Sequence, residues 1–305
     1  MPSSTSNSKP RLILQALAVC GLVLAGYQVI VSAHVVPPSD GIDMWEDNRV
    51  RAEHYLYDRG PSTPIALVGS SLTANLKASY FDQPIENLGF HGGDGLTGLD
   101  IIRRSGSKPS VVVVEVDETL DRGVDKPFVD GLFQQPLYSA RRKVTMLRQE
   151  YQPASVLVCA VKNRAKRGRA SSDDAPKGGP VEDKLHALLI SHILATDRKP
   201  LSPIEVDKCR RACDELGKVV DALKGDGSRV VLMEIPGEVE VGASPRQMAL
   251  RTLTHECLPE GRFEWLASPP ARTWRTADGV HLIKPDAKFF AAYVESRLQP
   301  GVAQK

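Results

Sequence analysis

The first hydrophobic stretch of the chain is long enough to cross a membrane. Residues 12–36 contain no Asp, Glu, Lys or Arg, and Lys9 and Arg11 precede them. As a helix this stretch would be about 37 Å long at ~1.5 Å per residue, which exceeds the ~30 Å hydrocarbon core of a bilayer. Positive charge on this flank favours a cytoplasmic N-terminus. We therefore predict a cytoplasmic tip and a transmembrane anchor in residues 1–37, with the rest of the chain exported.

Two other interpretations of this stretch stay open. A secretory signal could end at Val31-Ser32-Ala33, where small residues fit a cleavage site. Its apolar region would then be longer than the usual ~7–15 residues. A buried helix of a soluble protein would also be apolar over this length.

A polar segment with helical spacing follows the hydrophobic stretch. Ile42, Trp45, Val50 and Tyr55 recur at intervals that place them on one side of a helix. We expect residues 38–60 to form a juxtamembrane helix that leads into a domain.

Short apolar runs then alternate with segments of helical periodicity, and this alternation is typical of an α/β fold. The run SVVVVEV is apolar on both faces, as expected for a strand covered by helices on both sides. The pattern predicts an α/β domain over residues 61–299, a three-layer sandwich with a mainly parallel five-stranded sheet. The expected strands are 64–69, 84–87, 110–116, 229–235 and 262–267, and the expected helices are 95–105, 136–151, 183–195, 203–224, 244–255 and 285–298.

One segment of this domain breaks the alternation. Residues 162–180 are charged, rich in Ser, Gly and Pro, and almost without apolar side chains. Such a segment buries too little surface to offset the entropy lost on ordering. We expect it to be a mobile insertion or a lid.

Charge and cysteine content exclude several classes of protein. The net charge of +2 argues against a nucleic-acid-binding protein. The five cysteines show no CxxC or Cys/His zinc spacing, and the histidines are scattered, so we expect neither a metal nor another cofactor. Cys209 and Cys213 would share one face of a helix, which favours free thiols over a disulfide framework.

The first candidate for chemistry is a serine that follows the first strand. IALVG, residues 65–69, ends in Ser70 and Ser71, and a helical pattern begins there. Ligands in open α/β sheets bind beyond the carboxyl ends of the strands. A serine at this point is therefore either a nucleophile or a helix N-cap.

The second candidate lies near the end of the chain. Asp278 and His281 are three residues apart, immediately before an amphipathic helix. A carboxylate can orient an imidazole, and that imidazole can accept a proton from a serine hydroxyl. Together with the early serine, this pair suggests a catalytic triad.

These motifs resemble the blocks of the SGNH, or GDSL, hydrolase superfamily. Gly69-Ser-Ser-Leu-Thr is similar to the first block, with the nucleophile at Ser71 and with Ser70 where aspartate is usual. Asn87 and Gly92 match the spacing of the second block, and Asp278-Gly-Val-His281 matches the last. The resemblance implies an SGNH-hydrolase-like, flavodoxin-like domain with an oxyanion hole formed by the N–H groups of Ser71 and Gly92.

The third block of that superfamily is missing. The family usually has an asparagine after the third strand, and its side chain donates to the oxyanion. Here Glu118 and Thr119 stand near that place. The resemblance leaves Ser70, His91 and Thr119 as further candidates for the substrate pocket.

The resemblance implies acyl transfer outside the cytoplasm. We expect a serine esterase or an O-acyltransferase that acts on acyl, foremost acetyl, esters of an envelope or secreted polysaccharide. The expected location is a single pass of a bacterial inner membrane with the domain in the periplasm. An O-acyltransferase would need a polytopic membrane partner to deliver the acyl group. The alternative is a catalytically weak or inactive SGNH-like module that binds glycan or a membrane partner.

Overall fold

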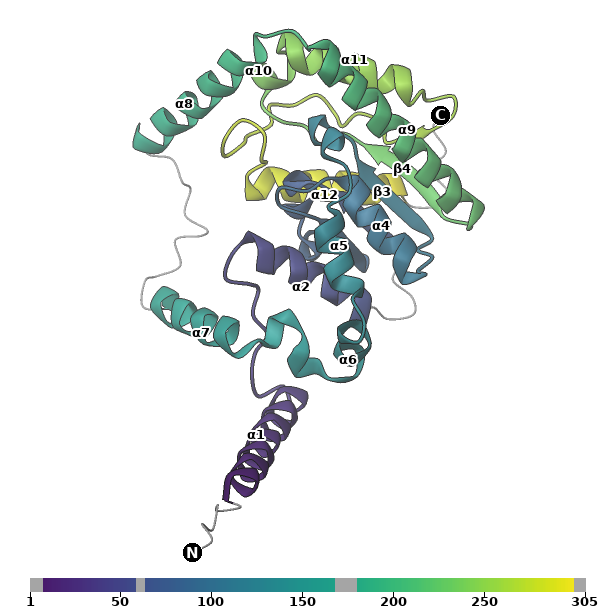
Figure 1. Ribbon diagram of the computed structural model, residues 1–305. Coiled ribbons are helices and arrows are strands. Elements are labelled where there is room, and N and C mark those ends of the chain that lie inside the picture. The colour runs from purple at the N-terminus through teal and green to yellow at the C-terminus, as the bar shows by residue number, and fades with distance from the viewer. Residues whose placement is uncertain (1–7, 59–63, 168–179, 299–305) are drawn as a thin grey trace, which may run out of the picture. The chain divides into compact units, whose positions relative to one another are not determined.

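The described part of the protein separates into two compact units. One unit joins residues 1–53 to 133–172, and the other joins 54–132 to 173–305. The sequence pattern assigns the stretch from residue 133 onward to the α/β domain, but part of it clusters with the N-terminal segment. The computed structural model describes residues 8–58, 64–167 and 180–298 (Figure 1).

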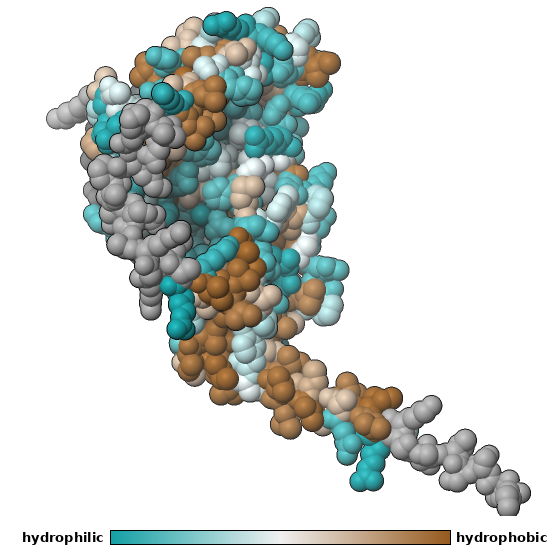
Figure 2. Space-filling model, turned by 90° about the vertical axis from the view of Figure 1, so that its left-hand side faces the viewer, coloured by the Kyte–Doolittle hydropathy of each residue, from teal (hydrophilic) through white to brown (hydrophobic). Residues whose placement is uncertain are grey.

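The first unit begins with a hydrophobic helix, α1, from Ser8 to Ser32. Within Pro10–Ser32, the most apolar 18-residue stretch has a mean hydropathy of 2.0, and none of that stretch is buried against the rest of the chain. Its apolar side chains, such as Leu22 at 73% exposure, are open to the surroundings (brown in Figure 2). Length and composition therefore allow α1 to cross a membrane, as the sequence predicts.

The last turns of α1 are tied to short helices from later in the chain. The Tyr27 hydroxyl donates to the carbonyl of Tyr151 at 2.6 Å, and the Met146 N–H donates to the side-chain oxygen of Gln28 at 3.0 Å. The helix expected over residues 136–151 is interrupted, because Val144 adopts an extended conformation. The segment instead forms α6 (Leu137–Lys143) and the 3₁₀ helices η3 (Thr145–Leu147) and η4 (Gln149–Tyr151).

Two more helices involve this unit. The expected juxtamembrane helix is α2, Met44–Tyr57, whose last residues belong to the second unit. Helix α7, Pro153–Arg167, was not expected. It includes the first residues of the predicted mobile insertion, so that part of the prediction is wrong. The remainder of the insertion up to residue 179 lies outside the described residues.

The second unit is built on a five-stranded sheet that is entirely parallel. Its strand order is β2-β1-β3-β4-β5, the doubly wound order of flavodoxin-like sheets. All five expected strands are present. They are β1 (Ile65–Gly69), β2 (Ile85–Gly89), β3 (Val111–Glu115), β4 (Arg229–Met233) and β5 (Glu264–Trp265).

Side chains alternate between the two faces of this sheet, and helices cover both faces. Leu67, Val113 and Val231 share one core with Phe290 of α12 (Lys284–Leu298). On the other face α4 (Gly95–Ser105) packs on β1, where Gly98 lies against Val68, and α9 (Pro203–Gly225) packs on β4. This confirms the predicted α/β class.

The helices of this unit follow the strands as the periodicity predicts, with two omissions. The short helix α10 and helix α5 were not expected, because neither spans enough turns to show a clear period. The helices are α3 (Ser71–Ala74), α4 (Gly95–Ser105), α5 (Lys126–Phe133), α8 (Pro180–Asp197), α9 (Pro203–Gly225), α10 (Val239–Gly242), α11 (Pro245–Cys257) and α12 (Lys284–Leu298).

Candidate active site

Two adjacent serines at the end of β1 have opposite orientations. Ser70 is 2% exposed and is the N-cap of α3, where its hydroxyl oxygen accepts from the Leu72 N–H at 3.1 Å. Ser71, the next residue, is half-buried and begins the helix. The sequence left open whether this serine is a helix N-cap or a nucleophile. In the structure Ser70 is the N-cap of α3, whereas the Ser71 side chain points toward the imidazole of His281.

A buried carboxylate from the neighbouring strand holds this turn in place. Glu115, the last residue of β3, accepts the N–H groups of Ser70 and Thr73 at 3.0 and 2.9 Å. The hydroxyls of both residues also donate to it. Burial and the nearby Asp117 carboxylate raise the pKa of Glu115, while the hydrogen bonds from Ser70 and Thr73 oppose that shift. Glu115 thus fixes the residue that precedes Ser71 and the residue two positions after it.

The loop before α12 brings an aspartate and a histidine into one turn. Asp278 Oδ1 accepts the N–H groups of His281 and Val280 at 2.9 and 3.2 Å. Gly279, which follows Asp278 in this turn, has a φ of +103°, a conformation that residues with a side chain rarely adopt. A Cβ at Gly279 would also lie 3.1 Å from Ile193 Cδ1. Both observations explain the glycine within the Asp-x-x-His motif.

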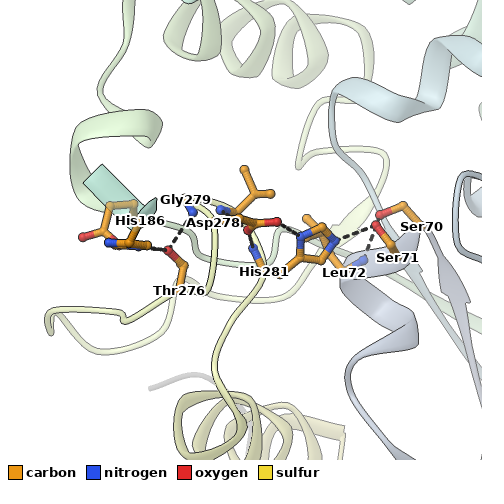
Figure 3. Close-up of polar contacts among 10 residues, drawn as sticks. Ser70, Ser71, Leu72, His186, Thr276, Asp278, Gly279 and His281 are labelled. Atoms are coloured by element: carbon orange, nitrogen blue, oxygen red, sulfur yellow. Dashed lines mark hydrogen bonds and ion pairs between the residues drawn. The ribbon is translucent and has the colours of Figure 1, made fainter. Parts of the chain in front are cut away.

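Three side chains form a continuous hydrogen-bonded chain in this site (Figure 3). Ser71 Oγ lies 2.8 Å from His281 Nε2, and His281 Nδ1 lies 2.7 Å from Asp278 Oδ2. An ionised carboxylate only accepts hydrogen bonds, so the ring proton belongs on Nδ1. Nε2 is then left to accept the serine proton. The structure thus brings together Ser71, Asp278 and His281 in the arrangement that activates a serine hydroxyl.

The electrostatics of Asp278 suit an orienting role. Burial by itself would raise its pKa, but the hydrogen bonds from the His281 ring and from the backbone N–H groups outweigh burial and lower the pKa to about 2. The carboxylate is therefore ionised at neutral pH and stabilises the imidazolium that forms when His281 accepts a proton.

A second set of polar contacts, away from Ser71, holds the loop that carries Asp278 and His281. Thr276 Oγ1 accepts the Gly279 N–H at 2.9 Å and donates to Glu238 Oε2 at 3.0 Å. His186 Nε2, from α8, lies 3.3 Å from the same hydroxyl (Figure 3). These contacts restrict the loop that carries His281 without touching the reacting atoms.

A cavity of about 240 Å³ opens in front of the triad. Thr119 and Ser70, two of the predicted candidates for a substrate pocket, line this cavity. The Thr119 hydroxyl donates to Asp117 Oδ1 at 2.6 Å, so its proton is already engaged. Gln247 Nε2 donates to Glu118 Oε2 at 2.8 Å and links α11 to the 3₁₀ helix η2, Glu118–Arg122.

The remaining predicted residues lie elsewhere. Asn87 donates to the carbonyls of Thr73 and Leu76, which is a structural contact. Gly92 has a φ of +74° and is exposed, with open space around the position of a Cβ. Among the described residues that line the triad cavity, neither Gly92 nor His91 is found. The role of Gly92 in an oxyanion hole therefore stays a prediction.

Sequence reasoning missed several residues of the site. Glu115 had one signal, a carboxylate within an otherwise apolar strand pattern. Glu234 and Arg251, which line the cavity, had none, because their chain neighbours do not indicate which way they face. The cysteines are free thiols, and Cys209 and Cys213 are buried on one face of α9, as expected.

The comparisons with known proteins add no assignment. The chain matches no protein-family model, and no curated protein is significantly similar to it. The geometry of the site and the motifs that form it are therefore the basis for assigning a function.

Proposed function

We propose that the chain is a membrane-anchored serine acyl hydrolase or O-acyltransferase of the SGNH type, acting on acyl esters of a carbohydrate. The observation that carries this proposal is the pair of contacts from Ser71 to His281 and from His281 to Asp278, at 2.8 and 2.7 Å. The triad faces a cavity, so a substrate carbonyl can approach the serine.

The first half-reaction forms an acyl-serine. The Ser71 hydroxyl oxygen attacks the ester carbonyl, and its proton moves to His281 Nε2. The tetrahedral oxyanion then collapses, the bond to the sugar oxygen breaks, and His281 returns the proton to the departing hydroxyl. Asp278 keeps the ring oriented throughout.

The second half-reaction releases the acyl group. Water or the hydroxyl of a second sugar attacks the acyl-serine, His281 accepts its proton, and Ser71 recovers that proton as it leaves. Attack by water makes the protein an esterase, whereas attack by a sugar hydroxyl makes it an O-acyltransferase. A transferase in this location would require a polytopic membrane protein that supplies the acyl group.

The oxyanion would be stabilised by backbone donors. The Ser71 N–H stands in the first turn of α3, where N–H groups have no intrahelical acceptor. The Gly92 N–H is the proposed second donor. Because the Thr119 hydroxyl donates to Asp117, it does not replace the side-chain donor of the superfamily.

The proposed location follows from α1. A helix of this length with basic residues before it favours a single pass through a bacterial inner membrane, with the catalytic unit on the periplasmic side. Such a location suits an envelope or secreted polysaccharide as the acyl carrier.

One observation favours a second candidate, a weakly active or inactive module that binds glycan. Loss of a single oxyanion donor typically lowers the rate about 10²–10³-fold. The engaged Thr119 hydroxyl leaves this site with one fewer donor than the superfamily pattern.

A covalent probe separates the two candidates. The full chain in detergent micelles is treated with a fluorophosphonate, and the labelled residue is identified by mass spectrometry. The enzyme proposal expects labelling at Ser71, its loss in Ser71→Ala, and unchanged labelling in the exposed control Ser191→Ala. Absence of labelling in the folded wild-type protein would contradict the enzyme proposal. Release of acetate from p-nitrophenyl acetate, with and without a sugar acceptor, then separates esterase from transferase.

A further inference from the structure

A second and larger cavity adjoins the triad cavity. Its volume is about 910 Å³. Its walls come from the segment after β4, which includes Glu234 and Ile235, from α11, and from residues 265–269 at and beyond β5. Glu234, Ile235 and Arg251 line both this cavity and the triad cavity. The two cavities are therefore neighbours that share one wall.

Two polar contacts of Glu234 hold that shared wall in place. Glu234 Oε2 accepts from Arg251 Nε at 3.0 Å, and Glu234 Oε1 lies 3.1 Å from His255 Nε2. Arg251 and His255 are one helical turn apart on α11. The carboxylate thus bridges the end of β4 to α11 at the boundary between the cavities.

The larger cavity has a fixed aromatic ring in its wall. The Trp265 ring stacks on His255, with centroids 4.2 Å apart and planes 24° apart. Its Nε1–H donates to the Leu258 carbonyl at 2.8 Å. Two contacts therefore set the orientation of the half-buried ring before any ligand arrives. A preorganised aromatic surface can pack against the apolar face of a sugar ring at a low entropic cost.

The charges around this cavity balance. Three arginines and three glutamates line it. Arg229 Nη2 lies 2.6 Å from Glu264 Oε1, and Arg251 pairs with Glu234. Two of the three arginines are thus neutralised within the wall. Such a lining offers many hydrogen-bond donors and acceptors without an excess of either charge, which suits a neutral ligand rich in hydroxyl groups.

The two volumes match two parts of one substrate. The triad cavity, at about 240 Å³, suits a small acyl group with the sugar that carries it. The larger cavity is near the upper end of the ~300–1,000 Å³ range of ligand pockets, so it exceeds what an acetyl group alone would need.

We propose that the cavity beside Trp265 is a subsite for a neutral oligosaccharide chain, whose ester-bearing residue reaches Ser71 past the Glu234–Arg251 pair. This inference rests on the proposed function for the direction of the chain, but binding in the cavity does not require catalysis. Trp265 supplies the stacking surface, and the charged side chains hydrogen-bond the hydroxyl groups.

Binding is measured on the full chain in detergent micelles with Ser71→Ala, so that no ester is cleaved. The probes are O-acetylated neutral oligosaccharides of two, four and six residues, the acetylated monosaccharide, and oligogalacturonate as a polyanion. Isothermal titration calorimetry should show affinity that rises with chain length for the neutral series. Adding Trp265→Ala should weaken the affinity for the neutral hexamer at least about tenfold, which corresponds to a loss of ~1.4 kcal/mol of binding free energy. Trp45→Ala, which removes an exposed tryptophan of the other unit, should leave this affinity unchanged.

Two further variants protect the test against misfolding. Trp265→Phe keeps a ring in the wall and should retain more affinity than Trp265→Ala. Glu260→Ala removes an exposed lining carboxylate and should weaken binding without a change in melting temperature.

The inference is overturned if no neutral oligosaccharide binds, if affinity does not depend on Trp265 in a folded variant, or if oligogalacturonate binds more tightly than the neutral hexamer. The experiments distinguish failure of this inference from failure of the proposed function. Fluorophosphonate labelling of Ser71 without oligosaccharide binding would contradict the subsite but leave the enzyme proposal intact. Oligosaccharide binding without labelling would contradict the enzyme proposal but leave the subsite intact.

Discussion

The Ser71 hydroxyl lies 2.8 Å from the imidazole of His281, although 210 positions separate the two residues in the chain. Each residue is oriented by contacts of its own. Glu115 holds the turn that carries Ser71, and Asp278 holds the ring of His281. Each set of contacts can therefore be tested separately.

Asp278→Asn should abolish most of the reactivity of Ser71 while leaving the fold intact. The amide can present its NH₂ to the ring and favour the wrong tautomer, which in serine hydrolases lowers kcat about 10⁴-fold. Steady-state hydrolysis of p-nitrophenyl acetate measures the effect, and circular dichroism checks the fold. Activity of Asp278→Asn within tenfold of wild type would show that Asp278 does not orient His281.

The lowered pKa of Asp278 also predicts the behaviour in acid. A carboxyl whose folded-state pKa is about 2, below the unfolded value of 3.8, stabilises the folded state above pH 3.8. That contribution is lost as the pH falls through about 2. Urea unfolding between pH 2 and 5 should therefore show a smaller loss of stability in acid for Asp278→Asn than for wild type.

Gly279→Ala should reduce both stability and activity. Its φ of +103° is strained for alanine, and the new Cβ would press on Ile193. Strain of this kind costs about 1–3 kcal/mol, and the displaced loop carries His281. Gly131→Ala is the matched control, because Gly131 lies in α5 with open space around it. That substitution should stabilise by about 0.5–1 kcal/mol. Equal effects of the two substitutions on melting temperature would contradict the assigned role of Gly279.

Glu115→Ala should be among the most damaging substitutions in the second unit. It leaves the buried N–H groups of Ser70 and Thr73 without their acceptor, and each unsatisfied buried group costs about 1–3 kcal/mol. Glu256→Ala, at an exposed position of α11, is the control and should change little. Chemical denaturation gives the free energy, and the rate of fluorophosphonate labelling reports the position of Ser71. A stable Glu115→Ala protein with a normal labelling rate would refute the anchoring role.

Asp94 predicts a loss of stability as the pH rises from acid to neutral. It is completely buried, its Oδ1 accepts from the Thr97 N–H at the start of α4, and burial raises its pKa to about 7. Because the folded state holds this proton more tightly than the unfolded state, the free energy of unfolding falls as the pH rises from about 4 to 7. Asp94→Asn keeps the cap and removes the ionisation. It should stabilise the protein by about 4 kcal/mol at pH 8, since the pKa rises by about 3 units from 3.8 and each unit is worth about 1.4 kcal/mol, and have little effect at pH 4. A pH-independent difference between the two proteins would contradict this prediction.

Charges placed within α1 should prevent membrane insertion. Leu17→Arg with Leu22→Arg adds two guanidinium groups to the exposed apolar surface, each costing about 2.5–3.5 kcal/mol near the centre of a spanning helix. The double variant should be extracted from membranes by alkaline carbonate, whereas wild type should remain. Leu185→Arg, on α8, serves as a control for the added charge. Extraction of the wild-type chain itself would argue against a membrane anchor.

The three central strands β1, β3 and β4 were predictable because they are almost entirely apolar. Each expected strand overlaps the observed one, and Val112 and Val114 face helices on one side while Val113 faces α12 on the other. Helix α7 was not predicted, because its apolar first half runs into a basic segment that resembles an exposed loop.

In the candidate site, the sequence predicted contacts between residues that are close together in the chain. Asp278 and His281 lie within one turn, so their contact follows from spacing alone. The hydrogen bonds of Glu115 and of Glu234 join segments distant in the sequence, and no local pattern specifies which strand end meets which helix.

The late position of His281 has a consequence for biosynthesis. During translation, the segment with Ser71 emerges long before the imidazole that would activate it. Under the proposed function, a nascent or truncated chain therefore carries an ordinary, unreactive serine, and Ser71 would gain its reactivity only once the C-terminal end of the domain has folded back onto the first strand. Modification of Ser71 by a covalent probe would accordingly report completed maturation of the polypeptide.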